Sequence, residues 1–138
     1  MATLHGTIVD TTTNEPIDAK VHVLDSGGNY RSPAGALQKV GQGTPFFFSD
    51  GEFSVDVGRG RTDVLVERGT EYRPQRLVVE TPAAGVVDVE IPIERWHHPQ
   101  QQHWYPGNTH IHYDEKETRP DARLGVDCSV EGYNVTCV

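Results

Sequence analysis

Hydrophobic and polar residues alternate along most of the first 95 residues of the chain, which is the pattern of β-strands that bury one face. The clearest stretch is VVDVEIPIE at residues 86–94, where Val and Ile alternate with acidic residues and with Pro92. We therefore expect the Val and Ile face in the core, and Pro92 on the outer face near a sheet edge. Strands are predicted over residues 4–9, 17–25, 46–48, 52–57, 62–68, 75–80 and 86–94.

Turn-forming residues separate these strands. TTTNEP at 11–16 follows the first strand and SGGN at 26–29 follows the second, so we expect the first two strands to pair as a β-hairpin. Residues 30–45 contain several Gly and Pro residues without a regular period and are predicted to be a long loop. About seven short strands at spacings of about 8–12 residues are typical of a β-sandwich. We therefore predict a mainly β first domain over residues 1–95.

The pattern changes after residue 95. Residues 96–107 (WHHPQQQHWYPG) are polar and aromatic, and are predicted to be a linker. A short strand is expected at 109–113, a charged loop at 114–119 and a helix at 121–132, for which Pro120 would be a favourable first residue. A buried strand is expected at 133–138. The strands of a β-α-β unit are parallel, and one unit cannot cover both faces of its sheet. Residues 108–138 are therefore expected to be the truncated start of a larger α/β domain.

Charge and composition indicate which classes of binding partner to expect. The chain has 138 residues and a formal net charge of −8, so phosphate backbones repel it and nucleic acid is not an expected partner. No apolar run reaches the roughly 20 residues that cross a bilayer, and the first residues do not resemble a secretory signal. If Met1 is the native start, we expect a cytoplasmic protein without a membrane partner. Cys128 and Cys137 form neither a disulfide framework nor a zinc knuckle, and are expected to be reduced core thiols.

The candidate metal ligands are His110 and His112. Successive side chains of a strand point to opposite faces, so the two imidazoles would project side by side from one face. Imidazole suits zinc, iron or manganese-type sites, and a bound metal can activate water near neutral pH. Taken alone, the pair fits histidines that bind nothing better than it fits a metal site, because a zinc site needs three or four protein ligands.

The residues around this pair each have two interpretations. Asp114, Glu115 and Glu117 could supply a further metal ligand or form a solvated acidic loop. Asn108 could orient a ligand by a hydrogen bond, or it could serve as a turn residue. The linker histidines at 97, 98 and 103 are expected to be solvated side chains.

The aromatic and charged segments that flank the linker are expected to be structural. Trp96, Trp104 and Tyr105 could stack on sugar rings, but we expect them to pack the sandwich against the segment that follows. Residues 68–74 (RGTEYRP) carry opposite charges around a turn, which predicts a network of surface ion pairs.

Several of these stretches resemble known families. GTIVD at 6–10, NEPI at 14–17 and AKV at 19–21 make residues 4–94 similar to a carboxypeptidase regulatory-like domain, which is a transthyretin-like (prealbumin-like) β-sandwich. GNTHIH at 107–112 makes residues 96–138 resemble the beginning of a PHP-type (polymerase and histidinol phosphatase) metal-dependent hydrolase domain. With RGTEYRP and the WYPG that precedes GNTHIH, the combination looks most like the CehA/McbA family of metallohydrolases.

The resemblance implies that His110 and His112 bind a divalent zinc, manganese or iron ion in the intact protein. Metal-activated water would then cleave an ester, carbamate or phosphoester bond of a small-molecule substrate. The family usually has Asp where this chain has Asn108, and it continues into Thr-Asp-His where this chain ends at Val138. Without the later ligands, this chain alone is expected to bind metal weakly or not at all, to be inactive, and to self-associate through open sheet edges.

Two other functions compete with this one. In the first, the sandwich is a non-catalytic binding or interaction module for a protein or a carbohydrate, and the aromatic linker is its interface. In the second, the sandwich itself is a hydrolase, as in transthyretin-like hydrolases. The second is the weaker, because residues 1–95 contain only His5 and His22 and the chain lacks that family's Tyr-Arg-Gly-Ser ending.

Overall fold

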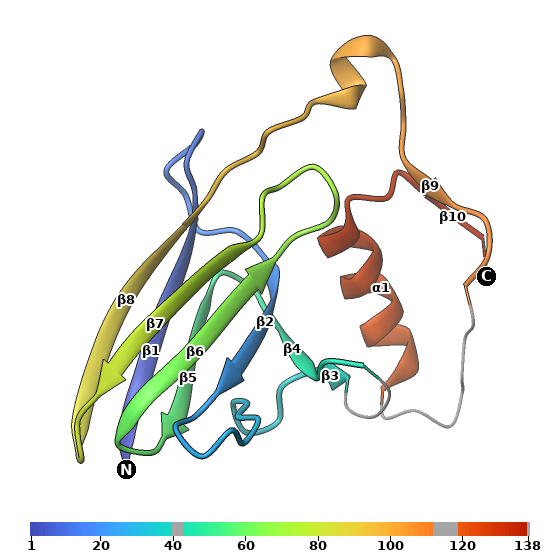
Figure 1. Cartoon of the computed structure of the whole chain (residues 1–138). Coiled ribbons are helices and arrows are strands. Elements are labelled where there is room, and N and C mark those ends of the chain that lie inside the picture. The colour runs from blue at the N-terminus through green and yellow to red at the C-terminus, as the bar shows by residue number, and fades with distance from the viewer. Residues whose placement is uncertain (40–42, 112–118, 138) are drawn as a thin grey trace.

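The structure, a computed structural model, describes residues 1–39, 43–111 and 119–137. Within these residues the chain is mainly β, with ten strands in three sheets, one α-helix and one short 3-10 helix. Two sheets form the body of the molecule, and the α-helix lies beside them together with the small third sheet (Figure 1).

The larger sheet has five antiparallel strands in the order β3-β4-β2-β6-β7. These strands are β2 (Ala19–Leu24), β3 (Gln38–Lys39), β4 (Phe46–Ser49), β6 (Gly60–Glu67) and β7 (Gln75–Thr81). In β6, Thr62, Val64 and Val66 are buried while the residues between them are more exposed. This alternation means that one face of the sheet is turned toward the core.

The smaller sheet has three strands in the order β5-β1-β8. Its strands are β1 (Ala2–Asp10), β5 (Glu52–Val57) and β8 (Gly85–Ile93). The central strand β1 is antiparallel to β5 and parallel to β8. At its middle, Gly6 faces Phe53, and a Cβ atom added at Gly6 would lie 2.3 Å from the Phe53 ring. Gly6 therefore leaves the space that the buried ring occupies.

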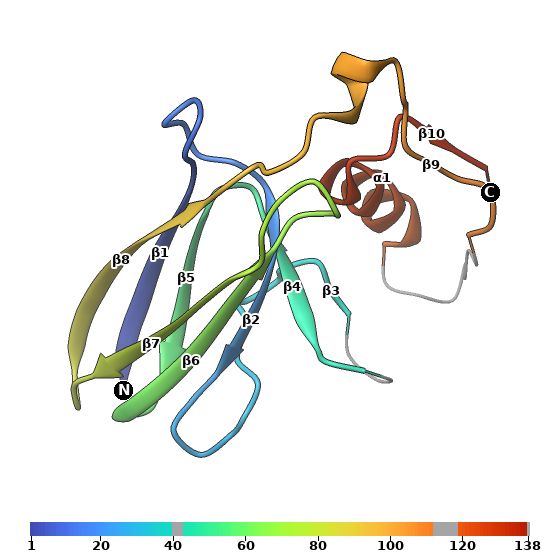
Figure 2. The same cartoon turned by 45° about the horizontal axis from the view of Figure 1, so that its top comes forward.

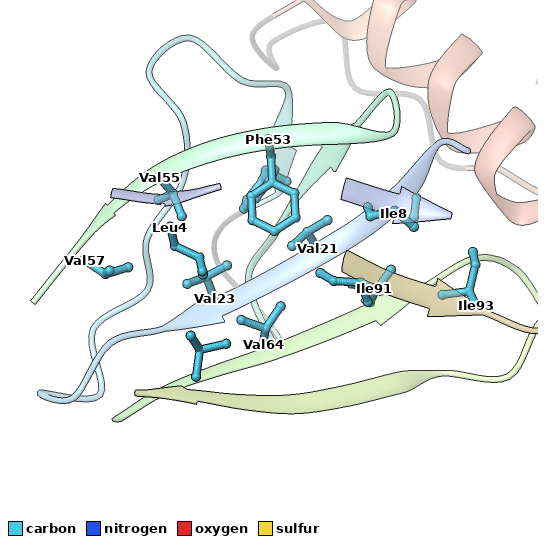
Figure 3. Packing of buried hydrophobic residues seen from close by; sticks show 14 of the residues in the cluster. Leu4, Ile8, Val21, Val23, Phe53, Val55, Val57, Val64, Ile91 and Ile93 are labelled. Atoms are coloured by element: carbon cyan, nitrogen blue, oxygen red, sulfur yellow. The ribbon is translucent and has the colours of Figure 1, made fainter. Parts of the chain in front are cut away.

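The two sheets enclose a single core of aliphatic and aromatic side chains (Figure 3). The core members include Leu4, Ile8, Val55, Val57, Ile91 and Ile93 from the smaller sheet, and Val21, Val23, Phe47, Val64, Val66 and Val79 from the larger. Burial of each such side chain contributes roughly 1.5–3 kcal/mol. The alternating apolar residues of the sequence are therefore the main source of stability for residues 2–93, which we call the sandwich.

The chain leaves the sandwich through η1 (Pro99–Gln102) and then forms β9 (Gly107–Asn108), α1 (Pro120–Glu131) and β10 (Val135–Thr136). β9 and β10 pair in parallel, with Thr136 opposite Asn108. Helix α1 begins at a proline and ends at Gly132, whose φ of 75° allows its N–H to bond back to carbonyls of the last turn. Figure 2 shows α1 beside the larger sheet, on the side of β4.

Most strands and the helix lie where the sequence pattern predicts them, but several predictions of local structure were wrong. The first two strands do not form a hairpin, because β1 and β2 belong to different sheets and only Val9 and Pro16 bridge the turn between them. The stretch 30–45 is not entirely a loop, because it contains the two-residue strand β3. The last strand is not buried, since Val135 is 60% exposed.

Candidate functional site

The parallel pairing of β9 and β10 brings together the residues that follow the two strands. β9 ends at Asn108 and β10 ends at Thr136, and the N–H of Cys137 donates a 2.9 Å hydrogen bond to the carbonyl of Asn108. His110 comes two residues after the end of β9. The carboxyl edge of parallel strands is where ligands bind in open α/β sheets. The described part of the candidate site is therefore this edge, with His110 beside it.

The local conformation of His110 is set by Asn108. The Asn108 side-chain Oδ1 accepts a 3.0 Å hydrogen bond from the backbone N–H of His110, which turns the chain away from the strand direction. His110 is exposed and lies outside β9, so the predicted strand over 109–113 is wrong for residues 109–111. The argument that one strand face aligns both imidazoles therefore does not apply to His110. His112 lies outside the described residues, as do Asp114, Glu115 and Glu117.

The remaining histidines and cysteines do not gather into a second site. Among residues 1–39, 43–111 and 119–137, no group of three His, Cys, Asp or Glu side chains is arranged to hold a metal ion. His97 and His103 are exposed, as expected for solvated linker side chains. Cys128 and Cys137 are free thiols, but they are partly exposed and exposed respectively, so the prediction that they are core residues was wrong.

Residues 68–74 hold the beginning of the linker against the sandwich. Glu71 is only 6% exposed; it forms an ion pair with Arg95 and accepts a 2.9 Å hydrogen bond from the side-chain amide of Gln100. The indole N–H of Trp96 donates to the carbonyl of Thr70 at 3.0 Å. The predicted surface network is thus partly buried, and it fixes the direction in which the chain leaves β8. We call this contact between residues 68–74 and 95–100 the linker clasp.

A second buried polar pair lies under the linker clasp. The Tyr72 hydroxyl donates a 2.7 Å hydrogen bond to Oδ2 of Asp10, and the backbone N–H of Thr12 donates to Oδ1 at 2.7 Å. Burial alone would raise the pKa of Asp10, but the hydrogen bonds from Tyr72 and Thr12 outweigh it and lower that pKa. Burial, together with the bond to Asp10, raises the pKa of Tyr72 to about 12. Sequence periodicity contains no signal for this pair, because its two members are far apart along the chain.

The two histidines of the sandwich do not converge. His22 is buried on the outer face of β2, where one ring nitrogen lies 2.9 Å from the Pro45 carbonyl and the other 2.9 Å from Glu67. His5 is on β1 in the other sheet and contacts Asp88 at 3.0 Å. These contacts give each ring a structural partner, and they do not assemble a catalytic group.

Three aromatic side chains after β8 are exposed. Trp96, Trp104 and Tyr105 are 52%, 70% and 62% exposed. The expectation that they pack the sandwich against the following segment is therefore wrong for Trp104 and Tyr105, whereas Trp96 contacts the sandwich through its bond to the Thr70 carbonyl. Arg73 lies over the Trp96 ring, with its guanidinium carbon 5.8 Å from the ring centroid, so this ring has a cationic neighbour on one face.

Comparison of the sequence with protein-family models and with curated proteins finds no match. None of the helices in the described residues has both the length and the apolar character needed to cross a membrane.

Proposed function

We propose that residues 108–138 are the first β-α-β unit of a PHP-type metal-dependent hydrolase domain of the CehA/McbA kind. Residues 2–95 would be its transthyretin-like, carboxypeptidase regulatory-like sandwich. The observation that supports this best is the parallel pair β9 and β10, separated along the chain by α1, with His110 beside the carboxyl edge of the pair. A parallel β-α-β unit with histidines directly after its first strand, at the carboxyl edge, is consistent with the beginning of such a domain.

The residues of this chain fit a divalent metal only in part. Two imidazoles from His110 and His112 are compatible with zinc, manganese or iron, but a stable site needs at least one further ligand. When bound, the metal would supply an activated water and polarise an ester, carbamate or phosphoester group. The role of Asn108 would be to hold the backbone of His110 in place through the 3.0 Å bond to its N–H. The linker clasp would hold this edge at a fixed position relative to the sandwich.

The test is a zinc titration of the purified chain, followed through the side-chain nitrogen resonances of its histidines. We expect the signals of His110 and His112 to shift together, and the replacement of either residue by alanine to remove the shift of the other. His97→Ala is the matched control, because His97 is an exposed histidine outside the proposed site. If His110 keeps its response to zinc when His112 is replaced, the two rings do not share a metal and the proposal fails.

A second candidate function is recognition of a carbohydrate by the segment after β8. The exposed rings of Trp96, Trp104 and Tyr105 favour it, since exposed aromatic faces are unusual unless they bind a partner. Both tryptophans of the chain lie in this segment, so tryptophan fluorescence, excited selectively over the tyrosines, reports on it alone. We expect oligosaccharides that bind here to change the fluorescence of the wild-type chain but not that of Trp104→Ala. An unchanged spectrum across neutral, acidic and amino sugars would remove this candidate.

A further inference from the structure

A cavity of about 820 Å³ lies between α1 and the sandwich, and His110 is not among the described residues that line it. Its walls come from β4, β5, the segment 33–37 and one face of α1. The accessible apolar lining comes from Pro33, Ala36, Leu37 and Val126, while Phe47, Phe48 and Phe53 border the cavity but are buried. Its volume is within the range of about 300–1,000 Å³ that is usual for small-molecule sites.

Contacts with the sandwich hold both ends of α1, and the middle of the helix lies over the cavity. Near its end, Glu131 forms an ion pair with Lys20, and the Ser129 hydroxyl donates a 3.0 Å hydrogen bond to Asp18. At its start, the Arg119 side chain donates to the carbonyl of Gly35 at 2.8 Å. These contacts at the two ends oppose collapse of α1 onto the apolar wall.

A small residue at the middle of the helix provides part of the space. Gly125 lines the cavity, and a Cβ atom added there would meet no atom within 4 Å. Glycine costs about 1 kcal/mol relative to alanine in a helix interior. The glycine thus lowers helix propensity at a position where the structure has room for a side chain.

The charged part of the lining is acidic, and the other polar residues of the described lining are serines. Asp18, Asp50 and Glu52 line the cavity, and no Lys, Arg or His is among the described residues that do. Asp18 already contacts Arg68 and Ser129. Asp50 and Glu52 are exposed and have no ion-pair partner in the described part of the chain. A ligand that buries a hydrocarbon group here would meet two uncompensated carboxylates, on a chain of net charge −8.

We propose that this cavity binds a small amphipathic cation, an amine with an aromatic or aliphatic body. The body packs against Pro33, Leu37 and Val126, and the ammonium group lies against Asp50 and Glu52. The two carboxylates therefore favour an amine over a neutral or anionic analogue of the same shape. None of the described residues that line this cavity belongs to the proposed metal site at the ends of β9 and β10, so the binding of an amine does not depend on the hydrolase proposal.

The test compares three probes of one shape by isothermal titration calorimetry: 4-phenylbutylamine, 4-phenylbutan-1-ol and 4-phenylbutanoate. EDTA in the buffer excludes metal-mediated binding. We expect the amine to bind about fivefold more tightly than the alcohol at low salt, and the carboxylate to bind most weakly. The variant Asp50→Asn/Glu52→Gln should bind the amine and the alcohol equally. Equal binding of the amine and the carboxylate to the wild-type chain, or binding of no probe, would overturn the proposal.

Two variants at one position test the location. Gly125→Leu puts a bulky side chain into the cavity beside Val126 and is a better helix former, so we expect it to fold, as a thermal melt will verify, and to lose binding of the amine at least tenfold. Gly125→Ala is the matched control, which should retain binding. NOE contacts between the probe ring and the methyl groups of Val126 give a second readout. Unchanged binding by Gly125→Leu would place the probe elsewhere. A wild-type dimer that Gly125→Leu dissociates would make a second copy the occupant; either result overturns the proposal.

Discussion

The bond between Tyr72 and Asp10 allows a quantitative prediction about stability. Tyr72→Phe keeps the ring, which lies 4.9 Å from the guanidinium carbon of Arg68, and removes only the hydroxyl that donates to Asp10. Asp10 is 5% exposed, so little water can replace the lost donor at Oδ2. Hydrogen bonds to charged groups contribute roughly 1.5–3 kcal/mol. We therefore expect the free energy of unfolding at pH 7 to fall by about that amount.

The pH dependence follows from the direction of the two pKa shifts. The pKa of Asp10 is lowered in the folded state, so its contribution to stability is present above its unfolded pKa and is lost as the pH falls through the folded value. The pKa of Tyr72 is raised to about 12, so its contribution is complete below about pH 10 and is lost between about pH 10 and 12. The difference between wild type and Tyr72→Phe should therefore be largest between about pH 5 and 10 and shrink on both sides.

Urea denaturation monitored by far-ultraviolet circular dichroism, at pH 3, 7 and 11.5, measures this difference. Tyr30→Phe is the matched control, because the Tyr30 hydroxyl makes a longer, exposed contact of 3.3 Å with Gln38. Substitutions of that kind usually change stability by less than about 0.5 kcal/mol. The reasoning would be refuted if Tyr72→Phe destabilised the chain no more than Tyr30→Phe at pH 7, or if the difference persisted unchanged at pH 11.5.

Three further predictions concern close packing and a turn. Gly6→Ala should lower the free energy of unfolding by about 1–3 kcal/mol, because the new methyl group displaces the buried ring of Phe53; equal stability in a thermal melt would contradict this. Gly69→Ala should release the end of α1, because its φ is +51° and a Cβ atom would lie 2.4 Å from the Glu131 carbonyl oxygen; faster amide exchange confined to α1 would be the readout. The pKa of Asp25 is lowered to about 2, first by the backbone bond from Asn29, so its stabilisation should be lost only below about pH 4, and Asp25→Asn should flatten that part of the acid titration.

The sequence pattern predicts the faces of the strands well, because it depends on residues within the same strand. In β5, Phe53, Val55 and Val57 are buried as the alternation indicates, and in β8 the residues Ile91 and Ile93 are buried while Pro92 is exposed on an edge strand. Alternation with a period of two reports only which side of a strand is apolar. It therefore succeeds wherever a strand has one face in the core.

The pairing of strands could not be predicted in the same way, because it depends on partners distant in the sequence. The turn after β1 looks like a hairpin turn, but in the structure β1 and β2 belong to opposite sheets, and the core is enclosed between them. Each places its apolar residues in the same interior from its own side, as Leu4 and Val23 do. The periodicity is the same for both arrangements, so the local pattern did not distinguish them.

The candidate site was predicted less completely than the fold. The helix after Pro120 is confirmed, and the two strands that flank it are parallel as predicted, but the first of them lies at Gly107–Asn108 and not at 109–113. The strand over the histidines is wrong for residues 109–111, because the Asn108 side chain bonds to the N–H of His110 where a continuing strand would bond to a neighbour. The linker clasp was missed in part, because the burial of Glu71 arises from its packing against Arg95 and Gln100, which follow it by more than twenty residues.

The position of β1 between β5 and β8 has a consequence for synthesis on the ribosome. Ala2 pairs with Gly85 and Asp10 pairs with Ile93, so β1 is synthesised well before its second neighbour β8 and must wait for it. Until residue 93 has emerged, one edge of that strand stays open to pairing with other chains. Chains that stop before β8 should therefore depend on chaperones to keep this edge from pairing with other chains. Chains that extend beyond β8 can cover this edge of β1 themselves.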